Sequence, residues 1–228
     1  MVALVWHVAF ARFFGVSVDV VAAALLGLAV WVIYVADRLL DTAQVHEPEE
    51  TVRHAFHARY RRGFLVGILV ALIVAAVLTI QLERRLLIFG ALMVGVSVSY
   101  GGLVHRRVVR VPKEVLCGAV FSVGVLAPLF VVPVPWVSMI LFGAVCTANC
   151  MVISSAEGEI QENCRRWIGL SILLLAIASF FVGALIQLAM AASFVGLLVL
   201  HVVRLPKETT RVLADVVLLT PLLVWPWL

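Results

Sequence analysis

Long apolar runs separated by short polar segments dominate this chain. A helix that crosses the hydrocarbon core of a bilayer needs about 20 apolar residues, each adding about 1.5 Å. Nine segments reach or approach this length: residues 2–16, 17–40, 64–82, 85–101, 113–132, 135–156, 165–182, 184–203 and 207–227. The first is short and the seventh and eighth nearly merge, so eight helices is the alternative. The pattern predicts an all-α polytopic membrane bundle of about nine transmembrane helices, in one domain over residues 1–228.

The composition supports a location in a membrane. Hydrophobic residues make up 64% of the 228 residues and charged residues 13%, whereas a soluble domain carries about 25% charged residues. We expect an integral protein of the cell inner membrane, in contact with membrane lipids. Segment 2–16 lacks the basic region and the small-residue cleavage site of a signal peptide, so we expect it to stay attached as the first helix.

Basic residues are distributed unevenly between the two sides of the predicted bundle. With nine helices, the loops after the second, fourth, sixth and eighth helix and the adjoining helix ends carry 14 of the 17 lysines and arginines. The positive-inside rule then places these loops and the N-terminus in the cytoplasm, and the C-terminus outside. The net charge of +4 reflects this topology and anionic headgroups, so we expect no nucleic acid partner.

A short repeat relates two parts of the chain. The sequence VVRVPKE at residues 108–114 recurs as VVRLPKE at 202–208, and each copy opens an apolar segment with a proline near its first turn. Two acidic clusters, which end the second and the sixth predicted helix, are likewise four helices apart. A duplicated four-helix unit, helices 2–5 and 6–9, explains both spacings. The simpler alternative is that one favourable helix start was used twice.

The first acidic cluster lies in WVIYVADRLLDTAQ, residues 31–44, at the end of an apolar run. On a helix, Asp37 and Asp41 are one turn apart, about 6 Å along the axis. Unpaired carboxylates repel one another and resist burial, so their presence at the rim of a membrane bundle implies a cation. The alternative is an ordinary charged helix end at the headgroup boundary.

The second acidic cluster is SSAEGEIQEN, residues 154–163, directly after the sixth apolar segment. On a helix, Ser155 and Glu159 share one face, and Glu157 lies on the neighbouring face. Carboxylates that leave room for water and for substrate phosphates suit Mg²⁺. A solvated acidic loop is the alternative.

These residues and their spacing resemble the UbiA superfamily of intramembrane prenyltransferases, whose members form a nine-helix bundle with two acidic motifs at the cytoplasmic ends of helices 2 and 6. The first family motif, NDxxDxxxD, is matched in its second half by Asp37 and Asp41, while Ile33 and Tyr34 occupy its first two positions. Residues 99–124, SYGGLVHRRVVRVPKEVLCGAVFSVG, are similar to the family's tyrosine-plus-basic loop and the glycine-dotted helix after it.

The second family motif, of the kind NDxxSxEGD found in chlorophyll-synthase-like members, is matched at four positions or nearly so. Ser155, Glu157 and Gly158 agree with it, Glu159 replaces its final aspartate, and the leading Asn-Asp pair is replaced by Met151 and Val152. The loss of both leading pairs removes oxygen ligands, so we expect a weaker metal site than in the family.

The resemblance implies an Mg²⁺-dependent transfer of an isoprenyl group from a prenyl diphosphate to a hydrophobic acceptor, either aromatic or lipid. It implies that Asp37 and Asp41 hold one Mg²⁺ and that Glu157 and Glu159 hold or orient a second. Arginine and lysine side chains suit the diphosphate oxygens, and an aromatic ring face steadies a carbocation. The substrate-binding residues implied are Arg38, Tyr100, Arg106, Arg107, Lys113 and Ser155.

A second hypothesis is a catalytically degenerate UbiA-like protein that binds or transports a lipid or isoprenoid. Internal repeats with polar residues at corresponding places also describe transporters. Asp215, in the last predicted helix, favours this hypothesis, because an ionisable residue at membrane depth is a candidate functional site. It has a competing explanation as a partner of Arg211, one turn earlier.

Overall fold

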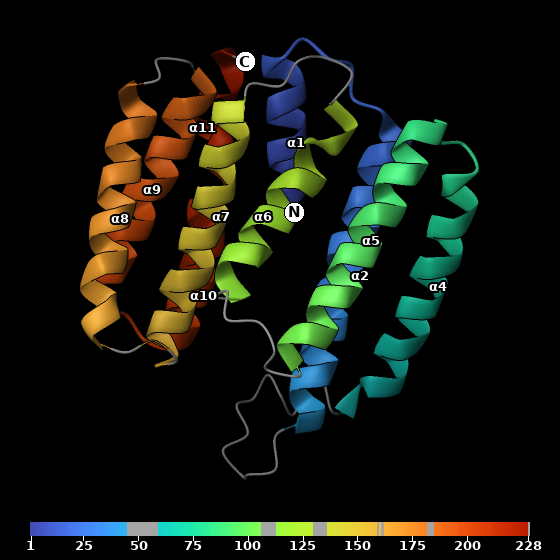
Figure 1. Cartoon of the computed structure of the whole chain (residues 1–228), viewed down its shortest axis with the longest axis horizontal. Helices are drawn as coiled ribbons and strands as arrows, with labels where there is room; N and C mark the ends of the chain where they lie inside the picture. The colour runs from blue at the N-terminus through green and yellow to red at the C-terminus, as the bar shows by residue number, and fades with distance from the viewer. Residues whose placement is uncertain are drawn as a thin grey trace. The chain divides into compact units, whose positions relative to one another are not determined.

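The computed structural model describes residues 1–44, 59–105, 113–129, 136–158, 160, 162–181 and 185–227. Within these residues the secondary structure is entirely helical, which confirms the all-α prediction, and each of the nine predicted segments contains a helix. The helices, drawn in Figure 1, are α1 Val2–Phe13, α2 Val20–Gln44, α4 Arg61–Thr79, α5 Arg84–His105, α6 Lys113–Leu126, α7 Trp136–Ala156, α8 Glu162–Phe181, α9 Leu185–Val203, α10 Lys207–Val217 and α11 Pro221–Val224, with short 3₁₀ segments η1 Ala127–Leu129 and η2 Trp225–Trp227.

Four helical segments in the described part of the chain are long and apolar enough to cross a membrane. They are Arg61–Thr79, Trp136–Ala156, Leu185–Val203 and Lys207–Trp227. Apolar side chains along α4, among them Leu65, Leu69 and Ile73, are exposed in the folded chain, as expected for a helix that contacts lipid tails. These features indicate a membrane protein.

The chain divides into two compact units, residues 19–87 and residues 1–18 together with 88–228. In the smaller unit α2 packs against α4. Asp19 starts α2, because its Oδ1 accepts hydrogen bonds from the backbone N–H groups of Val21 at 2.8 Å and Ala22 at 3.1 Å. Such an N-cap stabilises a helix by about 1 kcal/mol. The one acidic residue that precedes Asp37 therefore has a local structural role.

Helix α1 is shorter than the predicted segment 2–16. Gly15 adopts a left-handed backbone with φ of 66°, a conformation that costs glycine little. The N–H of Val16 then bonds back to the carbonyl of Ala11 at 2.8 Å, which is the usual way in which such a glycine ends a helix.

The core of the larger unit forms around this short helix. Trp6 and Phe10 of α1 are fully buried against Phe142 of α7. The Trp6 and Phe142 ring centroids are 4.7 Å apart, and Phe10 meets Phe142 edge to face at 5.3 Å. Because buried aromatic rings contribute large apolar areas, α1 is a central element of this unit.

Helices α6 to α9 lie in the larger unit, in which α10 also packs against α7 and α9. Helix α7 packs against α6, α8 and α9, and α8 packs against α9, as the neighbouring ribbons in Figure 1 illustrate. Helices α8 and α9 are therefore two separate, adjacent helices, rather than the single merged segment of the eight-helix alternative.

The two helices that open at the repeated PKE sequence are both interrupted at a proline. Helix α6 gives way to η1, which contains Pro128, and α10 ends at Val217, before α11 begins at Pro221. The predicted segment 207–227 is thus not one continuous helix. The sequences at the two interruptions, LAPLFVVP from residue 126 and LTPLLVWP from residue 219, are also similar.

Neighbouring residues of α1 contact both interruptions. A proline lacks the N–H that would bond a carbonyl three or four residues earlier. His7 Nδ1 donates to the carbonyl of Val125 at 2.9 Å, and Trp6 Nε1 donates to the carbonyl of Leu218 at 2.8 Å, both in buried surroundings. Each carbonyl lies three residues before its proline, so α1 replaces an equivalent missing bond in both helices, as a broken helix in a membrane requires.

Replacing Trp6 with phenylalanine should destabilise the protein by about 1–3 kcal/mol, because the Leu218 carbonyl stays buried without its donor. The measurement is the unfolding midpoint of the purified protein in detergent. The matched control is Trp136→Phe at the start of α7, where the tryptophan is 73% exposed and the change should stay within about 0.5 kcal/mol. Equal effects at the two positions would contradict a role for the indole N–H.

Candidate functional site

The C-terminal end of α7 carries the second acidic cluster. Gly158 has φ of 82°, a backbone conformation that suits glycine at the end of a helix. The N–H groups of Glu157 and Gly158 bond back to the carbonyls of Ile153 and Ser155. The glycine of the sequence SAEGE therefore ends α7, and Glu157 lies directly after its last turn.

Glu114, in the first turn of α6, lies against this end of α7. The residue is 9% exposed, and its Oε1 accepts a hydrogen bond of 2.9 Å from the hydroxyl of Ser154. A carboxylate in the first turn is favoured by the helix dipole. One oxygen of this largely buried carboxylate is thus held by α7.

Glu157 forms an ion pair with Arg211 of α10. Arg211 also donates from Nη1 to Oε1 of Glu208 at 2.8 Å, three residues before it. The side chains of Glu157 and Arg211 are 20% and 17% exposed, so the pair is well shielded from water. We call Glu114, Ser154, Glu157, Glu208 and Arg211 the acidic end of the larger unit.

The two copies of the PKE sequence meet α7 at this acidic end. The glutamate of the first copy, Glu114, contacts α7 through Ser154, and that of the second copy, Glu208, is linked to Glu157 through Arg211. Ser155 directly follows Ser154 and is 5% exposed. Its hydroxyl has no hydrogen-bond partner among the described residues. Repeated sequence and buried polar groups thus coincide at one place.

Arg211→Gln and Glu157→Gln should each destabilise the protein by about 1–3 kcal/mol. Arg211→Gln leaves the shielded Glu157 carboxylate without this partner, and Glu157→Gln leaves the shielded Arg211 with the more exposed Glu208. The double variant should lose less than the sum, which a double-mutant cycle of unfolding free energies would measure. As a control, Arg85→Gln removes a pair with Glu83 in which both side chains are largely exposed, worth about 0–1 kcal/mol. Strict additivity would show that the pair contributes nothing.

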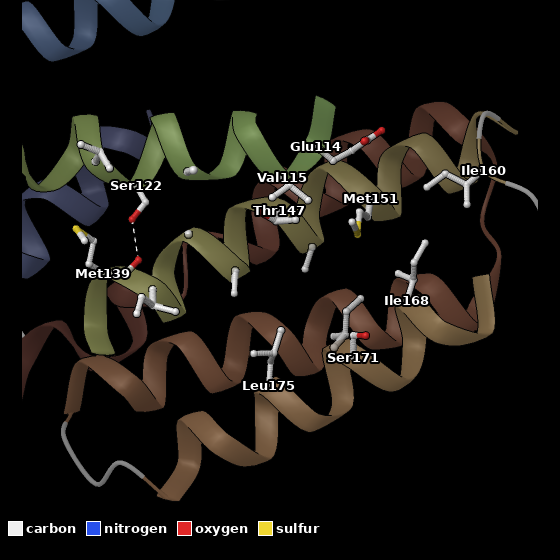
Figure 2. A pocket seen from close by; sticks show the side chains of 17 residues that line it. Glu114, Val115, Ser122, Met139, Thr147, Met151, Ile160, Ile168, Ser171 and Leu175 are labelled. Carbon is white, nitrogen blue, oxygen red and sulfur yellow. Dashed lines mark hydrogen bonds between the residues drawn. The ribbon is translucent and has the colours of Figure 1, made fainter. Parts of the chain in front are cut away.

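An apolar groove of about 790 Å³ runs from the acidic end between α6, α7 and α8. Glu114 lies at one end of it with Met151 and Ile160, and Ser122 and Met139 lie at the other (Figure 2). The hydroxyl of Ser122 already donates to the carbonyl of Met139 at 2.9 Å. Glu114 is therefore the strongly polar group of a groove whose lining is otherwise mostly aliphatic, and the volume is typical of a small-molecule site.

The structure places the predicted site residues unevenly. Asp37, Arg38 and Asp41 lie in α2, Tyr100 lies in α5 and Lys113 begins α6. The side chains of these five residues lie outside the described ones. Residues Arg106, Arg107 and Glu159 lie outside the described residues altogether. The continuous helix α2 supports the one-turn spacing of the two aspartates. Ser155 and Glu157 belong to the larger unit, whereas the two aspartates belong to the unit of residues 19–87.

The fit of Mg²⁺ can be judged for the described side chains alone. They contain no group of three or more histidine, cysteine, aspartate or glutamate side chains placed to hold a metal ion. Glu157 is bound to Arg211, which neutralises its charge, and one oxygen of Glu114 is bound to Ser154. Within the described residues, therefore, the acidic end by itself does not fit Mg²⁺. The other predicted ligands, Asp37, Asp41 and Glu159, lie outside this test.

The sequence alone does not identify Glu114 and Ser154 as site residues. It suggests Arg211 only as one of the basic residues that set the membrane orientation, or as a partner of Asp215. The repeated PKE sequence was the signal that could have identified Glu114, because a glutamate kept at the same place in both copies invites a common role. Asp215 itself is exposed in the last turn of α10.

Comparison of the chain with models of protein families, with curated proteins and with solved structures found no match.

Proposed function

We propose that this protein is an integral membrane prenyltransferase that transfers an isoprenyl group from a prenyl diphosphate to a hydrophobic acceptor. The observation that carries the proposal is the apolar groove that ends at a buried carboxylate, beside the second acidic motif. An apolar channel with one polar end suits a molecule with a hydrocarbon tail and a reactive head.

In this proposal the groove binds the isoprenoid chain, and the first acidic motif supplies the metal ligands. Asp37 and Asp41 would hold one Mg²⁺, and Glu159 would hold or orient a second. When bound, Mg²⁺ neutralises the diphosphate leaving group. Arg38, Arg106, Arg107 and Lys113 would bind the diphosphate oxygens, and Tyr100 would lie near the reacting carbon.

The test is release of pyrophosphate by the purified protein, reconstituted in phosphatidylcholine nanodiscs, from a panel of prenyl diphosphates. We expect release that requires Mg²⁺, stops with a chelator and increases with an aromatic or lipid acceptor. If protein that still shows a cooperative unfolding transition releases no pyrophosphate from any prenyl diphosphate of the panel, the enzymatic function is rejected.

A second candidate function is a membrane protein that binds an isoprenoid or lipid without chemistry. The Arg211–Glu157 ion pair favours it, because a neutralised carboxylate adds little to a cation site. Under this alternative the protein binds prenyl diphosphates and prenyl alcohols equally well, with or without Mg²⁺. Under the first proposal, binding of the diphosphates depends on the metal.

We also propose that nine helices span the membrane and that eight of them derive from a duplicated four-helix unit, with one copy in residues 17–132 and the other in residues 135–227. Three similarities support the duplication: the repeated PKE sequence, the proline interruptions of α6 and of α10 with α11, and the hydrogen bonds from α1 to equivalent carbonyls. Chance reuse of a helix start explains only the first of them.

The proposed orientation has the N-terminus in the cytoplasm and the C-terminus outside, on the basis of the uneven distribution of basic residues. Reporter fusions after Phe56 and after Leu228 should therefore give opposite signals for cytoplasmic and external location. Equal signals at the two sites would require a different number of spans between them.

A further inference from the structure

The groove has a measurable length and a polarity along it. On α7 its lining runs from Met139 to Met151, twelve residues apart, which corresponds to about 18 Å of helix. On α6 it runs from Glu114 to Val123, nine residues apart, or about 14 Å. Since Glu114 and Met151 lie at the same end (Figure 2), both estimates measure the groove from its acidic end to its apolar end.

This length corresponds to a definite number of isoprene units. An extended polypeptide gains about 3.6 Å for every three main-chain bonds, so an isoprene unit, which contributes four, extends by about 4.8 Å on the same scale. The groove therefore accommodates about three to four units in line. A four-unit isoprenoid has twenty carbons. If each carbon takes about the 30 Å³ of a water molecule in the liquid, the chain occupies about 600 Å³, which is less than the groove volume of about 790 Å³.

We infer that the groove selects an isoprenoid of three to four units, bound with its head at Glu114 and its tail end at Met139, an inference that rests on the proposed function. The buried carboxylate sets the direction, because it gains from a head that donates a hydrogen bond or brings a cation, whereas a hydrocarbon end would leave it desolvated without compensation. At the opposite end the Ser122 hydroxyl is already paired, so that end suits hydrocarbon.

Ala144 provides a way to shorten the groove. It lines the groove from α7 about halfway along, seven residues from Met151, or about 10 Å. In Ala144→Phe the added ring should leave room for about two isoprene units only. The matched control is Ala178→Phe on α8, an exposed alanine that does not line the groove.

The experiment uses the full chain in phosphatidylcholine nanodiscs and a photoreactive prenyl alcohol of four units with a diazirine at its tail end. We expect labelling within residues 122–123 and 139–140, and strongest competition from unlabelled prenyl alcohols of three and four units. In Ala144→Phe, labelling should fall at least tenfold while the affinity for the two-unit alcohol changes less than twofold; Ala178→Phe should behave as the wild type.

Other results would overturn the inference or separate it from the proposed enzymatic function. Labelling near Glu114, competition that is independent of chain length, or equal competition by the straight-chain octadecanol would overturn the inference, the last because the groove would then accept any single hydrocarbon chain. Prenyl alcohols carry no diphosphate and need no metal, so the result is separate from pyrophosphate release. Length-selective labelling without pyrophosphate release would support the inference and reject the enzymatic function, and release without length-selective labelling would do the reverse.

Discussion

Asp37→Asn and Asp41→Asn should each abolish the stabilisation of the protein by Mg²⁺ plus a prenyl diphosphate and lower pyrophosphate release by about 100-fold or more. Asparagine keeps the size and one oxygen but removes the charge that a hard cation requires. A ligand at 100 times its Kd stabilises a protein by about 2.7 kcal/mol, and this gain should vanish in both variants. The unfolding midpoints without ligand should change little, because like charges one turn apart cost only a few tenths of a kcal/mol.

Asp19→Asn is the matched control for these variants. Asp19 lies at the opposite end of the same helix and caps it through Oδ1, and asparagine caps a helix about as well as aspartate. This variant should retain the full ligand-induced shift. If Asp37→Asn and Asp41→Asn also retain it, the two aspartates are not metal ligands, and the prenyltransferase proposal loses its metal site.

Gly118→Ala should destabilise the larger unit by about 3 kcal/mol or more, because there is no room for a methyl group. A Cβ at Gly118 would lie 2.6 Å from the backbone nitrogen of Thr147 and 2.7 Å from the carbonyl oxygen of Gly143, and it would also collide with the Thr147 hydroxyl. Two of these atoms belong to the backbone of α7, so relief requires the two helices to move apart. The unfolding midpoint in detergent measures the loss.

Gly124→Ala makes the same chemical change in the same helix, where a Cβ meets nothing within 4 Å. Alanine is the better helix former by about 1 kcal/mol, so this variant should be as stable as the wild type or slightly more so. A similar loss in both variants would mean that α6 and α7 do not approach closely at Gly118.

The helical class was predictable because apolar runs of membrane length leave few alternatives. Helix ends were less predictable where one residue decides them. Gly15 ends α1 three residues before the predicted end, and Pro221 follows the interruption of the last predicted segment. Apolar periodicity continues through both places, so a pattern of hydrophobic residues alone does not reveal them.

The candidate site was predictable only where its spacing is local. The one-turn separation of Asp37 and Asp41 follows from the sequence and from the continuity of α2. The contact between Glu114 and Ser154 joins residues 40 positions apart, and that between Glu157 and Arg211 joins residues 54 apart. Sequence patterns give the face on which a side chain lies but not which distant helix meets that face. For this reason the resemblance implies a metal at Glu157, whereas the structure pairs Glu157 with Arg211.

The hydrogen bonds of α1 also set a time order for the folding of this chain. Trp6 and His7 are synthesised well before the carbonyls they bond, which follow 212 and 118 residues later. At about 5–20 residues per second, about 10–40 seconds pass between the synthesis of Trp6 and that of Leu218, whose carbonyl accepts its hydrogen bond. The segment around Leu218 therefore completes the environment of α1 only late in synthesis, and nascent chains cut short before Leu218 should leave α1 accessible to chaperones and proteases.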